Sequence, residues 1–337
     1  MYTVLGQEKA IATIERAAGA RRSHHAWIFA GPRGVGKCTT ALEFAKNILE
    51  TNADPIKHPD IHIIRKEDVV WSNNPALRKK KQTNIPLDLL RERIIGGITS
   101  DDKMHDAPAF KTPILGAKKV FIIDEAELLD AVGQNALLKT LEEPPLDTTV
   151  ILVTCRDDTL IPTIRSRCTL VSFAPLSEQK MQRWADGADL GVTPSNLAWA
   201  ISFANGSPGL VCEAVKTNLP QLADAISDFL LLKDKEYVSV TQKIISFTDS
   251  VVAASLKQNS SASKEATNRR VGELVLLMFG ASSQTLIENG HIEDGVAASQ
   301  ILSDIEQQFS TNISMKVLLE SLSARWVHLC GGDSVLM

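Results

Sequence analysis

Short runs of apolar residues recur through the first half of the chain, separated by segments with helical spacing. The runs lie at 27–30, 62–64, 118–125, 150–154 and 170–173. Because they lack the alternation of a half-exposed strand, they predict strands of a parallel sheet that is covered on both faces. Helical spacing is found at 39–49, 87–95 and 131–142. Strands that alternate with helices predict a doubly wound α/β fold, with a ligand crevice at the carboxyl ends of the strands.

From Ser177 onward the strand signals stop, and the apolar positions repeat with helical spacing. The predicted helices lie at 181–188, 196–204, 219–232, 238–252, 270–288 and 299–329, with a Ser-rich loop at 260–263. A chain of 337 residues also exceeds the roughly 100 to 200 residues of one ordinary domain. We therefore expect a sheet domain, a small helical piece near 177–215 and a larger helical bundle.

The first apolar run leads into a glycine-rich loop with the sequence Gly31-Pro32-Arg33-Gly34-Val35-Gly36-Lys37-Cys38. In the pattern G-x-x-x-x-G-K-[ST], the glycines let backbone N–H groups face phosphates, the lysine reaches the terminal phosphates, and the final hydroxyl binds magnesium. A strand before the loop and a helix after it are the context that this motif requires. The alternative is an ordinary strand-to-helix turn. Whether such a loop still binds nucleotide is a separate question that the motif leaves open.

The last position of the motif departs from the pattern, because Cys38 supplies a thiol in place of a hydroxyl. Magnesium prefers oxygen ligands, so a thiol is a poor substitute. The hydroxyl of Thr39 points about 100° away around the helix. If the loop binds nucleotide, the residues expected to hold ATP or ADP are Gly31, Gly34, Gly36, Lys37, Cys38 and Thr39, with weak magnesium binding and little hydrolysis.

Asp124 and Glu125 end the third apolar run. Phosphate-loop ATPases place there one carboxylate for the magnesium hydration shell and a second for the attacking water. The alternative is a pair of acids that caps the following helix. Asp124-Glu125-Ala126-Glu127 is also similar to the D-E-x-D/H box of helicases, so that family requires separate exclusion.

Two further residues are candidates for the same chemistry. Thr154 ends the next strand and is positioned to offer its hydroxyl to a γ-phosphate or to attacking water, although strand-terminal threonines are often structural. Arg167, in Ser166-Arg167-Cys168, follows on a polar turn. A solvated surface charge is the simpler interpretation. Its spacing also suits a role at a neighbouring subunit's nucleotide, where an arginine supplied in trans is worth about 10³ to 10⁵ in rate.

Charge and hydrophobicity limit the classes of protein to which the chain can belong. A net charge of −4 gives no global attraction to nucleic acid, and the basic run Arg78 to Lys81 is either a solvated loop or a local phosphate contact. The chain is 44% hydrophobic, yet no apolar run approaches the roughly 20 residues that span a bilayer. We expect a cytoplasmic protein without a membrane partner.

The cysteines and histidines do not indicate a metal centre. The five cysteines, Cys38, Cys155, Cys168, Cys212 and Cys330, are scattered without a C-x-x-C pair. This spacing suggests neither a disulfide framework nor a structural zinc site. We expect reduced and largely buried thiols, and no bound metal from the histidines.

Several blocks together resemble the AAA+ subunits of bacterial sliding-clamp loaders. The blocks are Gly6-Gln7, Gly31 to Lys37, Ile122 to Ala126, Asn135 to Pro145 and Pro162 to Cys168. The resemblance covers about the first 175 residues, and Gly206-Ser207-Pro208-Gly209 extends it into the lid. It implies an AAA+ domain at 1–175, a helical lid at 176–215 and a helical collar at 216–337. The L-K-x-L-E-E-P-P block and the S-R-C turn are not features of helicases, which excludes that family.

Two departures from the family pattern indicate the type of subunit. Hydrolysing members carry Ser or Thr at the position of Cys38, and a lid arginine at the position of Gly209. The chain therefore resembles the delta prime type, which closes one end of a hetero-pentameric loader and presents the S-R-C arginine, here Arg167, to the adjacent ATPase subunit. The resemblance implies other clamp-loader subunits as partners and, through them, the sliding clamp and primer-template DNA of DNA polymerase III.

Two alternatives stay open beside this interpretation. One is a hydrolysing gamma/tau-like clamp-loader ATPase that tolerates Cys38 and uses Lys37, Asp124, Glu125 and Thr154 in cis. The other is a helicase loader or a DNA-repair AAA+ protein, which the S-R-C and L-E-E-P-P blocks disfavour. The zinc module of this family is absent, and a longer polar segment at 67–112 stands in its place without a role that the sequence reveals.

Overall fold

The computed structural model describes residues 4–19, 24–79, 83–233, 235–258, 262–309 and 313–329. Within the predicted basic run and Ser-rich loop, Lys80, Lys81, Ser260 and Ser261 lie outside these residues, as does Cys330. The chain divides into two compact units, which are described separately. The first contains residues 1–189 and 204–210, and the second contains residues 190–203 and 211–337.

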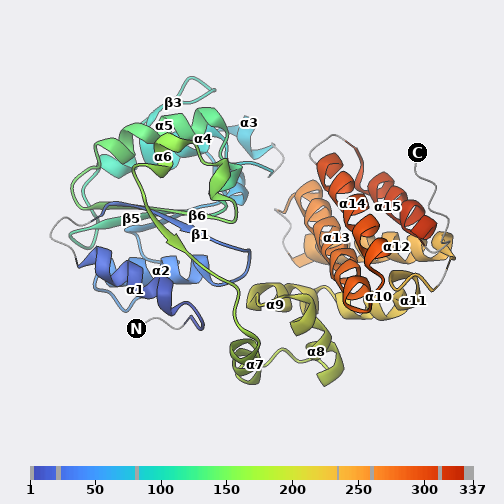
Figure 1. Ribbon diagram of the computed structural model, residues 1–337. Helices are drawn as coiled ribbons and strands as arrows, with labels where there is room; N and C mark the ends of the chain where they lie inside the picture. Colours follow the sequence, from blue (N-terminus) through green and yellow to red (C-terminus); the bar gives the residue numbers. More distant parts are fainter. Residues whose placement is uncertain are drawn as a thin grey trace. The chain divides into compact units, whose positions relative to one another are not determined.

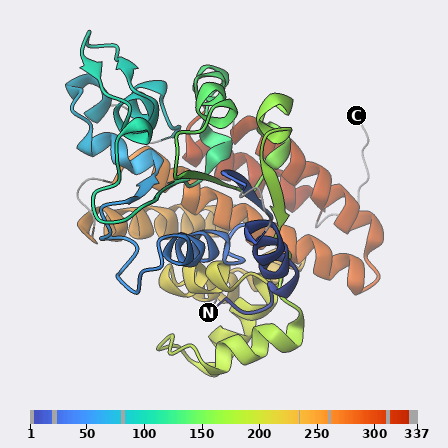
Figure 2. The ribbon, with the colours of Figure 1, turned by 90° about the vertical axis from the view of Figure 1, so that its left-hand side faces the viewer.

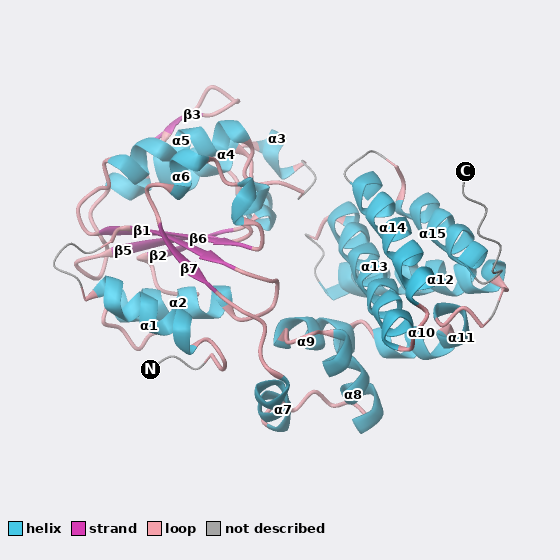
Figure 3. Ribbon diagram, in the orientation of Figure 1, coloured by secondary structure: helices cyan, strands magenta, loops and turns pink. Residues whose placement is uncertain are grey.

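A five-stranded parallel sheet forms the centre of the first unit, with the strand order β2-β5-β6-β1-β7 (Figure 3). The strands are β1 (Ala26–Ala30), β2 (Ile61–Ile64), β5 (Lys119–Ile123), β6 (Thr148–Thr154) and β7 (Thr169–Ser172). Every residue of β1 and β5 is buried, as expected of central strands covered on both faces. The predicted fold class is confirmed in this unit.

Helices cover both faces of the sheet and create two cores (Figure 1). On one face lie α1 (Glu8–Ala18) and α2 (Lys37–Ile48), and on the other lie α4 (Leu87–Leu90), α5 (Ala131–Glu142) and α6 (Pro162–Arg165). Helix α5 has the predicted bounds, and its N-terminus is capped by Asp130, which accepts the Gly133 N–H at 2.6 Å. The sequence analysis did not predict α1, which buries only Ala10 and Ile14.

The polar segment that follows β2 folds into short elements beside the sheet, as Figures 1 and 2 show in cyan and teal. They are α3 (Pro75–Arg78), α4, a π-helix (Arg91–Ile95), β3 (Gly97–Ile98), β4 (Met104–His105) and 3-10 helices at Lys66–Trp71 and Pro108–Phe110. Two buried charges anchor its end: the Asp60 carboxylate accepts backbone N–H groups from Ile114, Leu115 and Gly116, and the Lys119 ammonium donates to the carbonyls of Pro108, Ala109 and Lys111. The segment is therefore a packed part of the unit.

The remaining short elements complete this unit. They are the 3-10 helices Ala126–Leu128 and Asp157–Thr159 and the helix α7 (Glu178–Asp186). Helix α9 (Pro208–Lys216) begins in the first unit and continues in the second.

The second unit is helical, as predicted for the carboxyl half. Its helices are α8 (Pro194–Phe203), most of α9, α10 (Leu219–Ala225), α11 (Ser227–Leu230), α12 (Tyr237–Gln258), α13 (Lys264–Glu288), α14 (Ile292–Phe309) and α15 (Met315–Leu329). Phe279 lies at its core, with its ring 4.7 Å from that of Trp326 in an edge-to-face arrangement. The single helix predicted for 299–329 is wrong, because Ile313 and Ser314 are non-helical and Ser314 precedes the start of α15.

The fold bears on the predicted domain boundaries, the predicted burial of the cysteines and the predicted lack of membrane-spanning helices. The boundaries 1–175, 176–215 and 216–337 stay a prediction. The expectation that the cysteines are largely buried is wrong for Cys155 and Cys212, which are exposed. Among the described residues, no helix is both long enough and apolar enough to cross a bilayer.

Candidate functional site

The glycine-rich loop joins β1 to α2, and its three glycines have positive φ angles: 148° at Gly31, 78° at Gly34 and 101° at Gly36. Side chains at these positions would also lack space. A Cβ at Gly31 would overlap the carbonyl oxygen of Phe173, and one at Gly36 would lie 2.6 Å from Val4. The loop therefore has the backbone conformation that the motif predicts, and the unit packs tightly around it.

Lys37 begins α2 and is buried, with 7% of its surface exposed. Its ammonium donates to the carbonyls of Gly31 and Pro32, both at 2.6 Å. Burial lowers the pKa of Lys37, while Asp124 and Glu127 are among the nearby groups that oppose this shift. The lysine is thus held over the loop by backbone oxygens and faces the acidic end of the sheet.

The first turn of α2 provides no hydroxyl at the position where the motif requires one. Cys38 is partly buried, and burial, reinforced by Asp124, raises the pKa of its thiol to about 11. Thr39 is exposed. The hydroxyl of Thr40 is turned back along the helix and donates to the Gly36 carbonyl at 2.9 Å. The thiol therefore stays protonated at neutral pH, which leaves the hard-metal ligand missing.

Asp124 and Glu125 follow β5, and both carboxylates are paired with cations of this chain. Arg65, which follows the neighbouring strand β2, lies 3.5 Å from Asp124 (Nε to Oδ2). Glu125 has a positive φ of 54°, and its carboxylate meets Lys66 at 2.7 Å and Arg33 at 3.2 Å. Neither carboxylate therefore stands as an unneutralised anion at the end of the sheet.

Thr154 ends β6 directly beside Ala30, the last residue of β1. Only 1% of its surface is exposed, and its hydroxyl accepts the Arg156 N–H at 3.0 Å. Next to it, the Cys155 thiol donates to Glu127 at 2.7 Å. Although the residue as a whole is exposed, partial burial of its thiol group and this hydrogen bond raise the pKa of Cys155 to about 12. Thr154 thus shapes the turn after β6, at the same sheet edge as Lys37 and Asp124.

Arg167 lies on the turn between α6 and β7, on the surface. Its guanidinium pairs with Glu142 at the end of α5 at 2.7 Å, and it donates to the Thr163 carbonyl at 3.0 Å and the Ser166 hydroxyl at 3.4 Å. Its side chain is 36% exposed, against 46% for Glu142. These contacts are with α5, α6 and the turn, and none of them is with Lys37, Asp124 or Thr154.

Two contacts to the loop escaped the sequence analysis. The buried Gln7 amide donates to the carbonyls of Val35 and Ala174, and it accepts the Ala174 N–H. The only sequence signal was the Gly6-Gln7 pair, to which no role had been assigned. In addition, Ser207 donates to the Arg33 carbonyl at 2.7 Å, and the Gly209 N–H donates to Gly34 at 2.9 Å. The predicted lid motif thus closes directly on the phosphate loop.

The basic run is only partly described. Arg78 donates to the Ser72 carbonyl at 2.6 Å and so holds its own segment together, while Lys79 is exposed. Neither residue contacts the phosphate loop in the described part of the chain.

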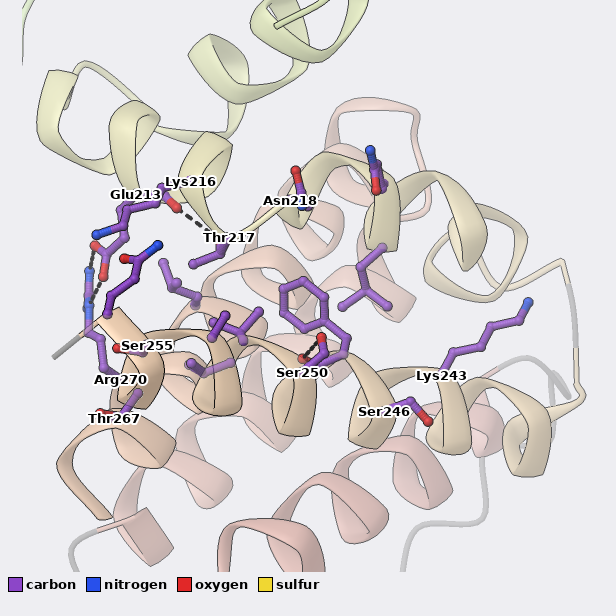
Figure 4. Close-up of a pocket in the computed structure, with 18 of the residues that line it drawn as sticks. Glu213, Lys216, Thr217, Asn218, Lys243, Ser246, Ser250, Ser255, Thr267 and Arg270 are labelled. Carbon is purple, nitrogen blue, oxygen red and sulfur yellow. Dashed lines mark hydrogen bonds and ion pairs between the residues drawn. The ribbon is translucent and has the colours of Figure 1, made fainter. Parts of the chain in front are cut away.

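The second unit contains a cavity of about 760 Å³ between α9, α10, α12 and α13 (Figure 4). Phe247, Val271 and Leu274 contribute apolar surface to it, and Lys243 lies on α12. The Arg270 guanidinium pairs with Glu213 and Glu273, which joins α9 to α13 at one side of the cavity. None of the described residues that line this cavity is a glycine, so this part of the chain provides no phosphate loop there.

Comparison with known proteins identifies the family. A family described as "DNA polymerase III, delta subunit" matches residues 6–177, which is more than half of the chain. The gamma/tau subunit of DNA polymerase III from Mycobacterium tuberculosis H37Rv is 33% identical over 179 residues, or 53% of this chain and 29% of the relative. The delta' subunit from Bacillus subtilis is 30% identical over 175 residues, or 48% of this chain and 45% of the relative.

The tau subunit of Bacillus subtilis is 32% identical over 208 residues, covering 60% of this chain and 35% of the relative. This chain therefore spans less than half the length of these relatives. The crystal structure of a gamma subunit-related protein from Thermotoga maritima covers 96% of this chain and 100% of its own, with a TM-score of 0.50 and 16% identity, which shows the fold alone. The chain belongs to the DNA polymerase III delta subunit family, and the expected relationship to bacterial clamp-loader subunits is confirmed.

Proposed function

We propose that this chain is a delta prime-type clamp-loader subunit of a DNA polymerase III holoenzyme. It hydrolyses little or no ATP itself and lends Arg167 to the nucleotide of a neighbouring subunit. Its partners are the other subunits of a hetero-pentameric loader and, through them, the sliding clamp and primer-template DNA. Its phosphate loop holds ATP or ADP without a well-bound magnesium ion.

The observation that carries this proposal is the setting of Arg167. The guanidinium is held on the surface by a half-exposed glutamate, by a carbonyl of α6 and by the Ser166 hydroxyl of the turn. Surface ion pairs are worth only about 0 to 1 kcal/mol, so an arriving phosphate displaces Glu142 at little cost. Arginine also offers a planar fork of N–H donors, which suits a phosphate oxygen pair.

The chain's own phosphate-loop site supports the same proposal, because it lacks groups that hydrolysis requires. Hydrolysis needs a carboxylate free to work on water or metal, whereas Asp124 and Glu125 are both paired with cations. The ligand position at Cys38 holds a thiol that stays protonated at neutral pH. We therefore expect the loop to bind a nucleotide but to lack the groups that accelerate its hydrolysis.

The test is the ATPase rate of the reconstituted loader that contains Arg167→Ala. We expect the rate to fall by about tenfold or more, because a trans arginine contributes about 10³ to 10⁵ in comparable enzymes. Arg165→Ala is the matched control, since Arg165 is exposed at the end of α6, two residues before Arg167. An unchanged rate with Arg167→Ala, or an equal fall with Arg165→Ala, refutes the proposal.

A hydrolysing gamma/tau-like subunit is the second candidate. It is favoured by relatives that carry the gamma/tau name and by the position of Lys37, Asp124 and Thr154 at one sheet edge. ATP turnover by the purified chain alone separates the two candidates. Turnover that disappears in Lys37→Ala supports the second, whereas turnover at the background rate in both proteins supports the first.

A further inference from the structure

Arg65 is placed beside the phosphate loop by the register of the sheet. Strands β2 and β5 run parallel with Ile64 opposite Ile123, so Arg65 and Asp124 are the next residues on each strand. The Asp124 N–H donates to the Ile64 carbonyl at 3.0 Å, which fixes the two strand ends against each other. The Arg65 backbone is fixed as well, because its N–H donates to Asp68 at 2.8 Å.

The guanidinium of Arg65 lies between two particular side chains. Its Nε is 3.5 Å from an oxygen of Asp124, and its Nη2 is 3.9 Å from the sulfur of Cys38. These are the two motif positions, on α2 and after β5, that hold the magnesium ion in a phosphate-loop ATPase. A fixed positive charge of the chain therefore occupies the region where a divalent cation would have its protein ligands.

The same residues do not fit magnesium. The ion requires near-octahedral oxygen ligands at about 2.0 to 2.1 Å, whereas this site offers one thiol and one carboxylate already paired with a guanidinium. Arginine places its charge and up to five N–H donors in one plane, a geometry that matches phosphate oxygens. Because the Arg65 side chain is 41% exposed, part of the guanidinium remains accessible to a ligand.

We propose that Arg65 takes the place of the divalent cation, so that this chain binds a nucleoside diphosphate or triphosphate through its phosphate loop without magnesium. The inference rests on the nucleotide-binding part of the proposed function. Lys37 and the loop N–H groups contact the phosphates from one side, and Arg65 supplies positive charge from the side of Asp124. Such a site retains nucleotide as a structural ligand, because a guanidinium neutralises phosphate charge without bridging the β- and γ-oxygens as a metal does.

The experiment measures the dissociation constants of ADP and ATP for the full chain by isothermal titration calorimetry, once in excess MgCl₂ and once in EDTA. For the unchanged chain we expect the two conditions to agree within about threefold. Arg65→Ala should weaken binding in EDTA by about tenfold or more, as expected for the loss of a charge-assisted hydrogen bond. Arg65→Lys, which keeps the charge but loses the planar fork, should fall between them.

A double variant tests the substitution of metal by arginine directly. Cys38→Thr combined with Arg65→Ala restores the hydroxyl and frees Asp124, so we expect binding to become at least about tenfold tighter in MgCl₂ than in EDTA. Cys38→Thr alone leaves the guanidinium in place and should gain little from magnesium. The control is Arg91→Ala, which removes another arginine of the same unit, 3.7 Å from its partner Asp88, and should leave both constants unchanged.

Three results overturn the inference: binding by the unchanged chain that is lost in EDTA, no binding in either condition, or unaltered binding by a folded Arg65→Ala. If Arg65→Ala fails to fold by circular dichroism, the comparison of the unchanged chain with and without EDTA and the Arg65→Lys titration still decide. The trans role of Arg167 is tested separately by the loader ATPase rate. A chain that binds no nucleotide but still needs Arg167 therefore overturns this inference alone.

Discussion

The phosphate loop and the Arg167 turn belong to one unit, but their charged groups are paired in different ways. Around the loop, the paired carboxylates of Asp124 and Glu125 are only 23% and 21% exposed, although Arg65, which pairs with Asp124, is 41% exposed. At the turn, Arg167 and Glu142 are 36% and 46% exposed. A charge that is removed from water costs several kcal/mol of free energy when its partner leaves, on the order of 3 to 5 kcal/mol. An exposed pair contributes only about 0 to 1 kcal/mol, so it exchanges partners easily.

The charges at the phosphate loop are therefore neutralised within the chain, whereas the ion pair at the Arg167 turn can exchange its partner. The acids at the loop already have cations of the chain, so the unit needs no metal to remain electrically balanced there. The arginine at the turn is held loosely enough to leave Glu142 for a stronger anion. Under the proposed function, one sheet retains a phosphate loop while Arg167 acts at a neighbouring subunit. A variant at each region tests this difference.

The strongest predicted change is in the reactivity of Cys155, an exposed residue whose thiol donates its proton to Glu127. Because its pKa is raised to about 12, its thiolate fraction at neutral pH should be roughly 10³-fold below that of an ordinary thiol. The fraction increases as pH rises and becomes complete only above that pKa. We expect iodoacetamide labelling of Cys155, followed by peptide mass spectrometry, to accelerate about tenfold per pH unit from pH ~7 to ~9.5.

Glu127→Gln is the matched variant for this measurement. It removes the negative charge that opposes the thiolate, so labelling of Cys155 should become faster at every pH, while burial still keeps the pKa above the ordinary value. A labelling rate that levels off near pH ~9 in the unchanged chain would show that the groups around the loop are not paired as described.

A second prediction concerns the packing of the loop itself. Gly31→Ala places a Cβ against the Phe173 carbonyl at a positive φ, and should lower the free energy of unfolding by about 3 kcal/mol. Gly97→Ala is the matched control in the same unit: φ is 110°, but the nearest atom is 3.8 Å away, so only the backbone strain of about 1 kcal/mol remains. Urea unfolding followed by tryptophan fluorescence measures both. Equal losses would mean that the loop can move away from β7 and is not a packed part of the sheet.

The sequence predicts the central sheet well because its strands are apolar on both faces, a signal that is independent of tertiary context. Helix α1 was missed although its buried residues Ala10 and Ile14 have the i, i+4 spacing of one helix face, a signal that the sequence analysis did not use. The segment after β2 depends on Asp60, whose backbone partners lie 54 to 56 residues later, and on Lys119, whose backbone partners lie 8 to 11 residues earlier. Neither set of contacts follows from a helical or strand periodicity. The packed structure of this segment therefore could not be read from composition, which indicated only an irregular polar region.

Sequence motifs likewise predict only part of the candidate site. Lys37, Cys38 and Asp124 were predicted from motifs, and the chain places them at one end of the sheet. Arg65 and Lys66 carry no motif of their own. Their importance depends on the parallel register that brings the end of β2 beside the end of β5, almost 60 residues later in the sequence. The cations that neutralise a site can thus be recognised only after the strands are paired.

A last prediction, with a modest change in activity, distinguishes whether Glu142 anchors Arg167 or competes for it. If the exposed pair must open before Arg167 reaches a neighbour's phosphate, Glu142→Ala should reduce by about twofold the amount of this chain needed for half-maximal loader ATPase activity. Glu143→Ala, an exposed carboxylate one residue later, is the control and should have no effect. A large loss of activity with Glu142→Ala would instead show that the glutamate positions the guanidinium. The turn would then be a preformed site, as rigidly paired as the phosphate loop.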